Sequence, residues 1–572
     1  MTPTEPCWPS DDAWKTLNAS VDGRLIRITP PASLCYPSEP NYNTEGCDLV
    51  LKGWLKPYFH SGDPTSIHSP ALANNSCNPI FENGTSIAGD TLAGESGCSL
   101  GVYPPYVVNA TEAAHVQAAL RFVNKWNLRV NIKNTGHSSK TALYGSLSIW
   151  THYMKNVEFH KDFQSTCQIS PPQTAFTIGA GLQDEEIFHA AAKYDMAVVG
   201  GTNSDVGLVG WATGGGHGYL TSEFGMGADS IIQAVVVTAS GDVVTANECQ
   251  NAGLLWAIRG GGGGTFGVIT ELTVKTHPMP QATTLLLNVE KKTNCTSCWW
   301  DLMAELHALL PGLKRQRLQG YYAIGGVPSF LAVTFYGVFF LYNKPNGTME
   351  AISEPLLELL HGANDTAKTT SQVAWAPSWI SVFDTLPSEG SAGGGGAASA
   401  SRLLPESALT EDIEKLARVL ELIGPSDEAS KAGVSNPSIA GSMAASSVAV
   451  DNALNPAWSD TVAHLIAKES WKDSLPYTQA NAALDDMTNV KGAALRSLAP
   501  GSGIYFNEAD ALEPDWKRAF WGPNYEKLLD IKHKYDPDGV FWCKKCVGSE
   551  VWVEQLDGEL CRVADGLLTV QY

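Results

Sequence analysis

Basic residues are scarce in this sequence of 572 residues. It has 38 Lys and Arg against 59 Asp and Glu, which gives a net charge of −21 at pH 7. Nucleic acids and anionic membrane surfaces are bound through basic faces, so neither is expected as a partner. Long apolar runs are also missing, and no stretch approaches the length that a membrane-spanning helix needs. With 44% hydrophobic and only 17% charged residues, the chain is still expected to fold around a sizeable core.

The first residues lack the features of a signal peptide, because Met1–Trp14 has neither a basic region nor an apolar one. Twelve cysteines and seven N-x-[ST] sequons nevertheless indicate the secretory route. Five of the cysteines fall in the first hundred residues, at Cys7, Cys35, Cys47, Cys77 and Cys98. The sequons are at Asn18, Asn74, Asn83, Asn109, Asn294, Asn346 and Asn364. We expect a mature, secreted, extracellular protein that carries N-glycans, has lost or exchanged its leader, and is a monomer.

Two C-x-x-C pairs, Cys295/Cys298 and Cys543/Cys546, are compatible with either a zinc site or disulfides. About 245 residues separate the pairs, which is far from the spacing of a zinc ribbon or finger. An oxidising compartment also favours disulfides, so no metal site is predicted.

The chain is too long for one ordinary domain, and its composition changes along its length. Residues 1–100 are rich in Pro, Ser, Asn, Gly and Cys and are expected to be a loop-dominated segment tied by disulfides. Helix and strand patterns then alternate over 101–277, which predicts a mixed α and β domain. Residues 278–499 carry no glycine motif and are expected to form a second domain, and 500–572 return to strong signals.

Individual elements can be predicted from apolar spacing and from capping and turn residues. Helices are expected after an N-cap at Thr111, near Asp184–Tyr194, Leu356–Leu360 and Glu411–Ile423, and at Pro523–Tyr535. Strands are expected at Leu128–Lys133, Met196–Val199, Ile231–Thr238, Asp242–Ala246, Val268–Val274, Leu285–Val289, Phe330–Phe340 and Ile504–Asn507. The low-complexity stretch Ser388–Ser399 is expected to be a mobile surface loop or lid.

Three glycine-rich segments stand out, at Asn134–Ser139, Gly200–Gly218 and Arg259–Gly267. Because glycine has no side chain, backbone N–H groups can approach and cradle a phosphate, and three such loops suit a dinucleotide. Gly262-x-Gly264-x-x-Gly267 matches the Rossmann fingerprint but precedes an expected strand rather than a helix, so a Rossmann site is not expected. The esterase pattern around Ser99 lies among cysteines and prolines without a strand before it, which disfavours a serine hydrolase.

Taken together, these segments resemble the berberine-bridge-enzyme-like branch of the vanillyl alcohol oxidase/p-cresol methylhydroxylase (PCMH) flavoproteins. The resemblance rests on Asn134-Thr-Gly-His-Ser138, on Gly200–Gly218, on Ile258–Thr270, and on the C-terminal segment from Tyr505-Phe-Asn507 to Pro537. It implies an α+β fold, in which a PCMH-type FAD-binding domain of two α+β subdomains is built from both ends of the chain. A substrate domain with an antiparallel sheet flanked by helices is inserted between them.

The resemblance also implies the contacts to the cofactor. His137 would be bonded to the 8α carbon of FAD, and a neutral imidazole nitrogen can make that bond. Many relatives hold the flavin a second time through a cysteine at the position of Asn203, so a single covalent link is expected here. The other residues expected to bind FAD are Asn134, Thr135, Gly136, Ser138, Ser139, Gly201, Thr202, Asn203, Val206, Gly207, Gly210, Gly214, Gly215, Gly216, Gly218, Gly267, Val268, Ile269, Asn507 and Asn524.

The catalytic base differs from the pattern of the branch, where the C-terminal strand often reads Y-x-N-Y-x-D. Here Glu508 stands at the place of the second tyrosine, which commonly deprotonates the substrate. A carboxylate shielded beside a flavin is expected to have a raised pKa and to accept a proton. Tyr505 is the reserve candidate, although on a strand it would point away from the face of Glu508.

Val206 bears on the electron acceptor, because in the family a valine here leaves oxygen a path to the flavin. We expect an oxidase that passes hydride from a small alcohol, phenol or secondary metabolite to FAD and then forms H2O2 from O2. A secreted carbohydrate oxidase and a flavin dehydrogenase remain alternatives. Two alternatives without a flavin also remain, namely a serine hydrolase that uses Ser99 and a non-enzymatic binding protein.

Overall fold

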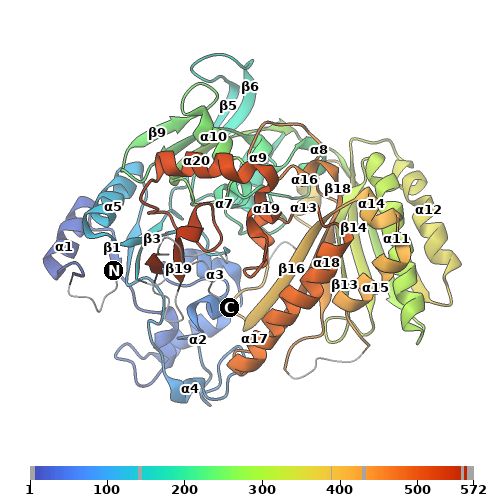
Figure 1. Cartoon of the computed structure of the whole chain (residues 1–572), viewed down its shortest axis with the longest axis horizontal. Coiled ribbons are helices and arrows are strands. Elements are labelled where there is room, and N and C mark those ends of the chain that lie inside the picture. Colours follow the sequence, from blue (N-terminus) through green and yellow to red (C-terminus); the bar gives the residue numbers. More distant parts are fainter. Residues whose placement is uncertain (1–6, 139–144, 388–389, 428–432, 555–559, 563–572) are drawn as a thin grey trace.

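A computed structural model describes residues 7–138, 145–387, 390–427, 433–554 and 560–562. Three large sheets organise this part of the chain, and the N- and C-terminal regions both lie against the first two (Figure 1). The mixed α and β class is confirmed. No helix in the described ranges is both long and apolar enough to cross a membrane.

The N-terminal segment is held by short helices and two disulfides. It contains α1 (Asp11–Ser20), α2 (Thr44–Gly53) and α3 (Pro57–Gly62), and its disulfides join Cys35 to Cys47 and Cys77 to Cys98. Its strand β1 (Leu25–Arg27) pairs with β2 (Tyr106–Asn109). The segment is therefore part of the first sheet rather than a separate appendage.

The first sheet has the order β1-β2-β4-β3, with β3 (Arg129–Lys133) and β4 (Ser146–Trp150) parallel to each other. Helix α5 (Ala113–Trp126) connects β2 to β3 and buries Val116, Leu120 and Val123 on its apolar face. The expected N-cap at Thr111 is wrong, because the helix begins after Glu112. The Thr111 backbone N–H instead donates to the imidazole of His115, 3.3 Å away.

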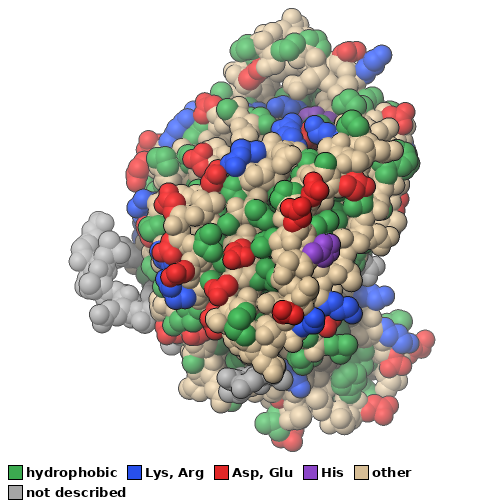
Figure 2. Space-filling view, turned by 90° about the vertical axis from the view of Figure 1, so that its right-hand side faces the viewer, with side chains coloured by type: hydrophobic (Ala, Val, Ile, Leu, Met, Phe, Trp, Pro, Cys, Tyr) green, Lys and Arg blue, Asp and Glu red, His purple; other side chains and the backbone are tan. Residues whose placement is uncertain are grey.

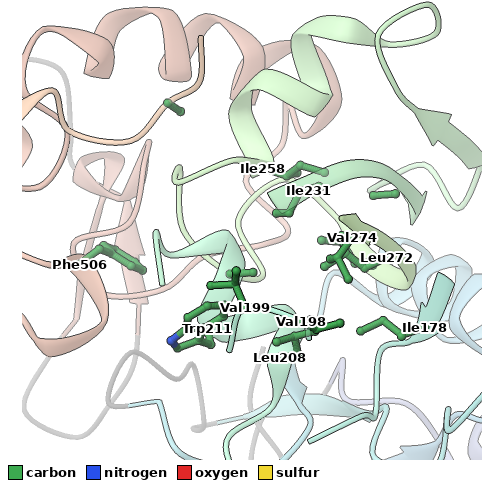
Figure 3. Close-up of a cluster of buried hydrophobic side chains, with 14 of the residues drawn as sticks. Ile178, Val198, Val199, Leu208, Trp211, Ile231, Ile258, Leu272, Val274 and Phe506 are labelled. Carbon is green, nitrogen blue, oxygen red and sulfur yellow. The ribbon is translucent and has the colours of Figure 1, made fainter. Parts of the chain in front are cut away.

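The second sheet is antiparallel, in the order β5-β6-β10-β8-β9. Its strands are β5 (Val157–Phe163), β6 (Gln173–Gly179), β8 (Ile231–Val237), β9 (Val243–Ala246) and β10 (Val268–Lys275). Helices α6 (Asp184–Ala192), α7 (Leu208–Thr213) and α10 (Ala252–Ile258) accompany it. Figure 3 shows Trp211 and Leu208 of α7 in one apolar cluster with Phe506 of the C-terminal segment. The two ends of the chain thus share a core.

The third sheet is formed by residues 282–471 and has seven antiparallel strands in the order β15-β12-β14-β13-β17-β18-β16. These are β12 (Ala282–Lys291), β13 (Gln319–Gly325), β14 (Thr334–Tyr342), β15 (Ala367–Ala376), β16 (Gly396–Pro405), β17 (Ser438–Ser442) and β18 (Thr461–Trp471). Leu285, Leu287 and Val289 alternate into a core with the helices on one face. Those helices are α11 (Thr296–Arg315), α12 (Thr348–Gly362), α14 (Glu406–Thr410), α15 (Ile413–Ile423) and α18 (Gly492–Leu498).

The helices cover the outer side of the third sheet, so its other face turns toward the first two sheets (Figure 1). On the outer face, acidic and basic side chains are interspersed with uncharged ones (Figure 2). The mobile loop or lid expected over Ser388–Ser399 is wrong at its end, because Gly396–Ser399 begin β16 and pair with β18. Residues 388 and 389 of this stretch lie outside the described residues. Within its first half, the backbone N–H of Gly393 donates to the carbonyl of His68 at 2.8 Å, which ties it to the N-terminal segment.

The C-terminal segment returns to the first two sheets through α19 (Trp516–Trp521) and α20 (Tyr525–Tyr535), and α20 packs on α10. The strand expected at Ile504–Asn507 is wrong, because Phe506–Glu508 forms a 3-10 turn. Both C-x-x-C pairs are closed as disulfides, as is Cys167–Cys249. Cys7 and Cys561 are free and exposed.

Candidate functional site

A cavity of about 370 Å³ lies where the glycine loops meet the C-terminal turn. This volume is within the range of small-molecule sites. The predicted residues that line it are Asn134, Thr135, Gly136, His137, Ser138, Gly201, Thr202, Asn203, Val206, Gly207, Gly210, Gly267, Ile269, Tyr505, Asn507 and Glu508. The sequence analysis therefore located most of one wall, and residues 263 and 264 of the third loop complete it.

Some predicted contacts lie elsewhere, and Ser139 falls outside the described residues. Gly214, Gly215, Gly216, Gly218, Val268 and Asn524 do not line the cavity. Val268 is fully buried in β10, and the side chain of Asn524 donates to the carbonyl of Leu454 at 3.0 Å. Glycine is required at position 218 by packing instead, because an added Cβ would lie 1.7 Å from the carbonyl oxygen of Gly200.

Two glycines allow polar side chains to approach the loops closely. A Cβ on Gly207 would lie 2.4 Å from the amide nitrogen of Asn134, and one on Gly214 would lie 2.2 Å from the amide oxygen of Asn507. Any other residue at these positions would displace those amides. The wall is thus built from backbone and short side chains, which suits a long ligand with phosphate groups.

At one part of the cavity wall, His137 contacts a buried carboxylate. Its Nε2 lies 3.0 Å from Oδ2 of Asp205, and Nε2 of His68 lies 3.3 Å from the same oxygen. The two imidazole rings are 3.6 Å apart between centroids. Asp205 is fully buried, and burial acts to raise the pKa of its carboxyl. Contacts from His137 and His68 outweigh burial and hold that pKa well below its ordinary range.

The neighbours of this cluster are also buried and carry little charge. Burial lowers the pKa of His68 to about 4 and that of His60 to about 3, so both are neutral at pH 7. Asp184 lies nearby and accepts the backbone N–H of Gly201 at 2.8 Å. Burial, reinforced by the charge of Asp205, raises the pKa of Asp184 well above its usual value. Asp205 therefore carries the negative charge beside His137.

A second cluster surrounds Glu508 on the C-terminal turn. Its Oε2 lies 3.3 Å from Nε2 of His217 and 3.8 Å from Nδ1 of His464. The other ring nitrogen of His217, Nδ1, lies 2.9 Å from the hydroxyl of Tyr321 on β13. Burial acts to raise the pKa of the Glu508 carboxyl, but the contacts of the carboxylate with His217 and His464 lower it to about 2. The expected raised pKa is therefore wrong.

Tyr505 also faces the cavity, contrary to the expected strand geometry, because the chain turns after it. Its hydroxyl accepts the amide of Asn507 at 2.8 Å. Burial and the charge of Glu508 raise the pKa of Tyr505 far above its ordinary value. Its phenol is therefore protonated at neutral pH.

Comparisons with known proteins agree with this site. The FAD binding domain family matches residues 104–247, and the berberine and berberine-like family matches residues 504–548. An FAD-linked oxidoreductase, apf9, from Gibberella fujikuroi is 34% identical, over 98% of this chain and 96% of its own. The VAO-type flavoprotein oxidase VAO615 from Thermothelomyces thermophilus is 33% identical, over 98% of this chain and 95% of its own.

The crystal structure of the VAO-type flavoprotein MtVAO713 from Myceliophthora thermophila superposes with a TM-score of 0.90 and 29% identity, covering 98% of this chain and 99% of that one. The chain belongs to the VAO-type, berberine-bridge-like FAD-linked oxidoreductases. Its fold class and its nature as an FAD-dependent oxidoreductase are thereby confirmed. The esterase pattern has no matching geometry, because Ser99 lies in a coil with no strand before it and no helix after it.

In this VAO-type flavoprotein, no described cysteine lines the cavity. Asn203 lines it instead, and its backbone carbonyl accepts the N–H of Val206 at 3.3 Å. Gly390, from the inserted domain, lies close enough that an added Cβ would be 3.1 Å from the Asn203 amide. The position that would carry a second flavin link is thus packed against the loop before β16.

Five residues of the two clusters, Asp205, His68, His217, His464 and Tyr321, were not singled out from the sequence. Asp205 and His217 lie inside the quoted glycine segment Gly200–Gly218, so an unassigned ionisable residue in a ligand loop was the available signal. His68 and Tyr321 lie in the N-terminal segment and on β13, without a motif around them. Their contacts join positions far apart in the sequence, which a local pattern does not report.

Proposed function

We propose that this flavoprotein carries FAD on His137 and oxidises the CH–OH group of a small alcohol, phenol or secondary metabolite, with O2 as the final acceptor and H2O2 as product. The observation that carries the proposal is that His137 and Glu508, each with its own charged partner, line the same cavity. FAD, when bound, accepts the hydride of the substrate carbon. The residues of the chain hold the cofactor and accept the proton of the substrate hydroxyl.

The way in which His137 is held supports the proposed covalent link. Asp205 contacts Nε2 of the ring at 3.0 Å, so Nδ1 is the nitrogen left to bond the cofactor. A carboxylate at this distance stabilises the positive charge that the ring gains when its nitrogen forms the bond. Asn203 has no thiol and cannot form the thioether that a cysteine would make, so one link is the expected number.

The proton of the substrate hydroxyl has acceptors at the other cluster. Glu508 is ionised at neutral pH and has 37% of its side-chain surface exposed. A carboxylate with a pKa near 2 is a weak base. Its negative charge instead stabilises positive charge that develops beside it, so Glu508 supports proton removal electrostatically.

Reaction with O2 is supported by Val206, which lines the cavity beside Asn203 with a short, branched side chain. The oxidase name of the 33% identical relative points the same way. A dehydrogenase would be reduced by the same substrates but would reoxidise slowly in air.

The test begins with purified protein. Acid-denatured protein should keep its flavin, and mass spectrometry should find one flavin-bearing peptide, containing His137. Benzylic, allylic and secondary aliphatic alcohols, phenols and oligosaccharides should then be screened for peroxide release. Colour that appears wholly in the supernatant would refute the covalent link. Flavin reduced only by sugars would move the proposal to a carbohydrate oxidase.

We also propose that the protein is secreted. Five disulfides use ten of its 12 cysteines, and Asn74, Asn83, Asn294, Asn346 and Asn364 are exposed sequon positions. Disulfides of this number favour an oxidising compartment. Recovery of the native protein from culture medium, with a mass decrease after N-glycosidase treatment, tests this.

A further inference from the structure

Three side chains from separate parts of the chain form one hydrogen-bonded line, in which Glu508 and His217 line the cavity and Tyr321 lies next to it, in contact with His217. Glu508 comes from the C-terminal turn, His217 from the glycine loop after α7, and Tyr321 from β13 of the inserted domain. The contacts run from Oε2 of Glu508 to Nε2 of His217 at 3.3 Å, and from Nδ1 of His217 to the Tyr321 hydroxyl at 2.9 Å. The line thus joins the FAD-binding part to the substrate domain.

The proton positions follow from the ends of this line. Glu508 is ionised and can only accept, so Nε2 of His217 carries the hydrogen that faces it. In a neutral imidazole Nδ1 is then an acceptor, and the Tyr321 O–H donates to it. The lone pairs of the Tyr321 oxygen remain able to accept a proton from a third group.

We infer that Tyr321 is the residue that takes the proton of the substrate hydroxyl, and that it passes its own proton to His217, whose charged form Glu508 stabilises. This inference deepens the proposed function and rests on it. The arrangement is analogous to a nucleophile–histidine–carboxylate triad. The phenol of Tyr321 takes the place of the nucleophile, and the substrate O–H is the source of the proton. Tyr321 is then a catalytic residue, and His217 and Glu508 are positioning residues.

The step balances without a further reactant. The substrate O–H bond breaks and its proton bonds to the Tyr321 oxygen, while the Tyr321 proton moves to Nδ1 of His217. The C–H bond breaks with its electron pair, the carbonyl π bond forms from the oxygen lone pair, and the hydride is accepted by FAD. Burial and the charges of neighbouring groups raise the pKa of Tyr321 well above its usual value. The phenol therefore needs His217 to receive its proton as it takes another.

The sheet beside Tyr321 has the properties of a substrate-binding surface. Tyr321, Ser442 and His464 are register partners on β13, β17 and β18, so their side chains share one face. The Ser442 hydroxyl and both ring nitrogens of His464 are buried, with no hydrogen-bond partner among the described residues. Unsatisfied buried groups of this kind are costly unless a ligand or water meets them. A substrate hydroxyl at Tyr321 would lie next to them.

Tyr505 is the competing proton acceptor, and its contacts disfavour it. Its hydroxyl accepts from the Asn507 amide at 2.8 Å and from the backbone N–H of Gly216. Neither group can receive a proton from it. Tyr505 and His217 meet edge to face, with ring centroids 4.8 Å apart, and no hydrogen bond joins them among the contacts described.

The chain offers a matched control on the same strand. Tyr322 points to the opposite face, and its hydroxyl bonds Nε2 of His307 at 2.8 Å in the core of the inserted domain. Tyr322→Phe therefore removes the same kind of Tyr–His hydrogen bond without touching the cavity. Flavin reduction is followed anaerobically by stopped flow in the parent, Tyr321→Phe, Tyr322→Phe and Tyr505→Phe, with the best alcohol from a benzylic, allylic and secondary aliphatic panel.

Tyr321→Phe should lower the limiting reduction rate about 10²-fold or more, the usual share of general-base catalysis. It should leave the covalent flavin in place, and Tyr322→Phe should match the parent. His217→Ala should lower the limiting reduction rate by a similar factor and should regain part of that rate when imidazole is added. A purely structural role of His217 would not produce this rescue. Equal flavin-reduction rates in Tyr321→Phe and Tyr322→Phe, or a loss of rate confined to Tyr505→Phe, would overturn the relay. A parent whose flavin no alcohol reduces would refute the proposed function, and the relay with it.

Discussion

Replacement of Asp205 by Asn is the sharpest perturbation of the proposed covalent site. Asparagine keeps the size of the side chain and removes its charge from a fully buried position. His137 and His68 lie 3.0 and 3.3 Å from the oxygen that is changed. The substitution therefore tests whether charge, rather than shape, prepares His137 to bond the flavin.

The size of the effect can be worked from the distance. A unit charge at 3.0 Å interacts by about 5 kcal/mol at an effective dielectric constant of about 20. If about half a charge has developed on the ring in the transition state, the loss is about 3 kcal/mol, which is about a 10²-fold slower attachment. FAD binding itself should persist, because the glycine loops are unchanged.

The assay produces the protein without its flavin, adds FAD, and follows acid-stable flavin fluorescence with time. The parent should reach one flavin per chain, and Asp205→Asn should lag about 10²-fold. The matched control is Asp184→Asn, a second fully buried aspartate near the same loop. Burial raises the pKa of its carboxyl and so favours the neutral form, which an amide replaces with less electrostatic change than at Asp205. Equal attachment rates in Asp205→Asn and the parent would refute the role given to the charge.

Three further predictions concern the other side chains. Glu508→Gln should lower the flavin-reduction rate about 10²-fold. The factor should be the same at pH 5 and pH 8, because the Glu508 carboxyl, with a pKa of about 2, is ionised at both. A factor that becomes smaller toward pH 5 would show that the pKa of Glu508 is raised. Val206→Leu should slow reoxidation of the reduced flavin by O2 while leaving its reduction by substrate unchanged, and equal reoxidation rates would contradict the oxygen path. His307 is fully buried, and burial lowers its pKa to about 4. Its neutral form therefore contributes up to about 3 kcal/mol of stability, which is complete above about pH 6.5 and is lost as the pH falls toward 4. Urea unfolding at pH 7 and pH 4.5 should show a smaller loss of unfolding free energy in the double variant His307→Leu/Tyr322→Phe than in the parent, and identical pH dependence in the parent and the double variant would refute this.

The sequence was sufficient to place the glycine loops, because each adjoins a strand whose pattern is local. Asn134–Ser138 follows β3, and residues 263–267 lead into β10, so the sheets bring them to one cavity. The C-terminal turn could not be predicted in the same way. Tyr505 and Phe506 are both buried, one in a cluster with Met226 and Leu403 and the other in the core with Trp211. Burial of consecutive residues breaks the alternation that a strand prediction uses.

The pKa of Glu508 was predicted with the wrong sign for a related reason. Burial alone raises the pKa of a carboxyl, and a sequence can suggest burial. The charge partners that reverse the shift are His217 and His464, which lie 291 and 44 residues away in the chain. Their approach depends on the packing of the third sheet against the C-terminal turn, and no local pattern encodes that.

The division of labour in the molecule follows from these contacts. The parts of the chain that carry the family motifs supply the cofactor cavity, and their glycines are fixed by close backbone approach, so they can change little. The inserted domain supplies Tyr321, Ser442 and His464 as one row of a sheet whose other face is closed by helices. Because such a row can change its side chains without disturbing the helical core, we expect it to decide the identity of the substrate. His217 of the glycine loops contacts both sides, with Glu508 at one ring nitrogen and Tyr321 at the other. In the proposed relay, the chemistry of the reaction and the choice of substrate would therefore be coupled through the imidazole ring of His217.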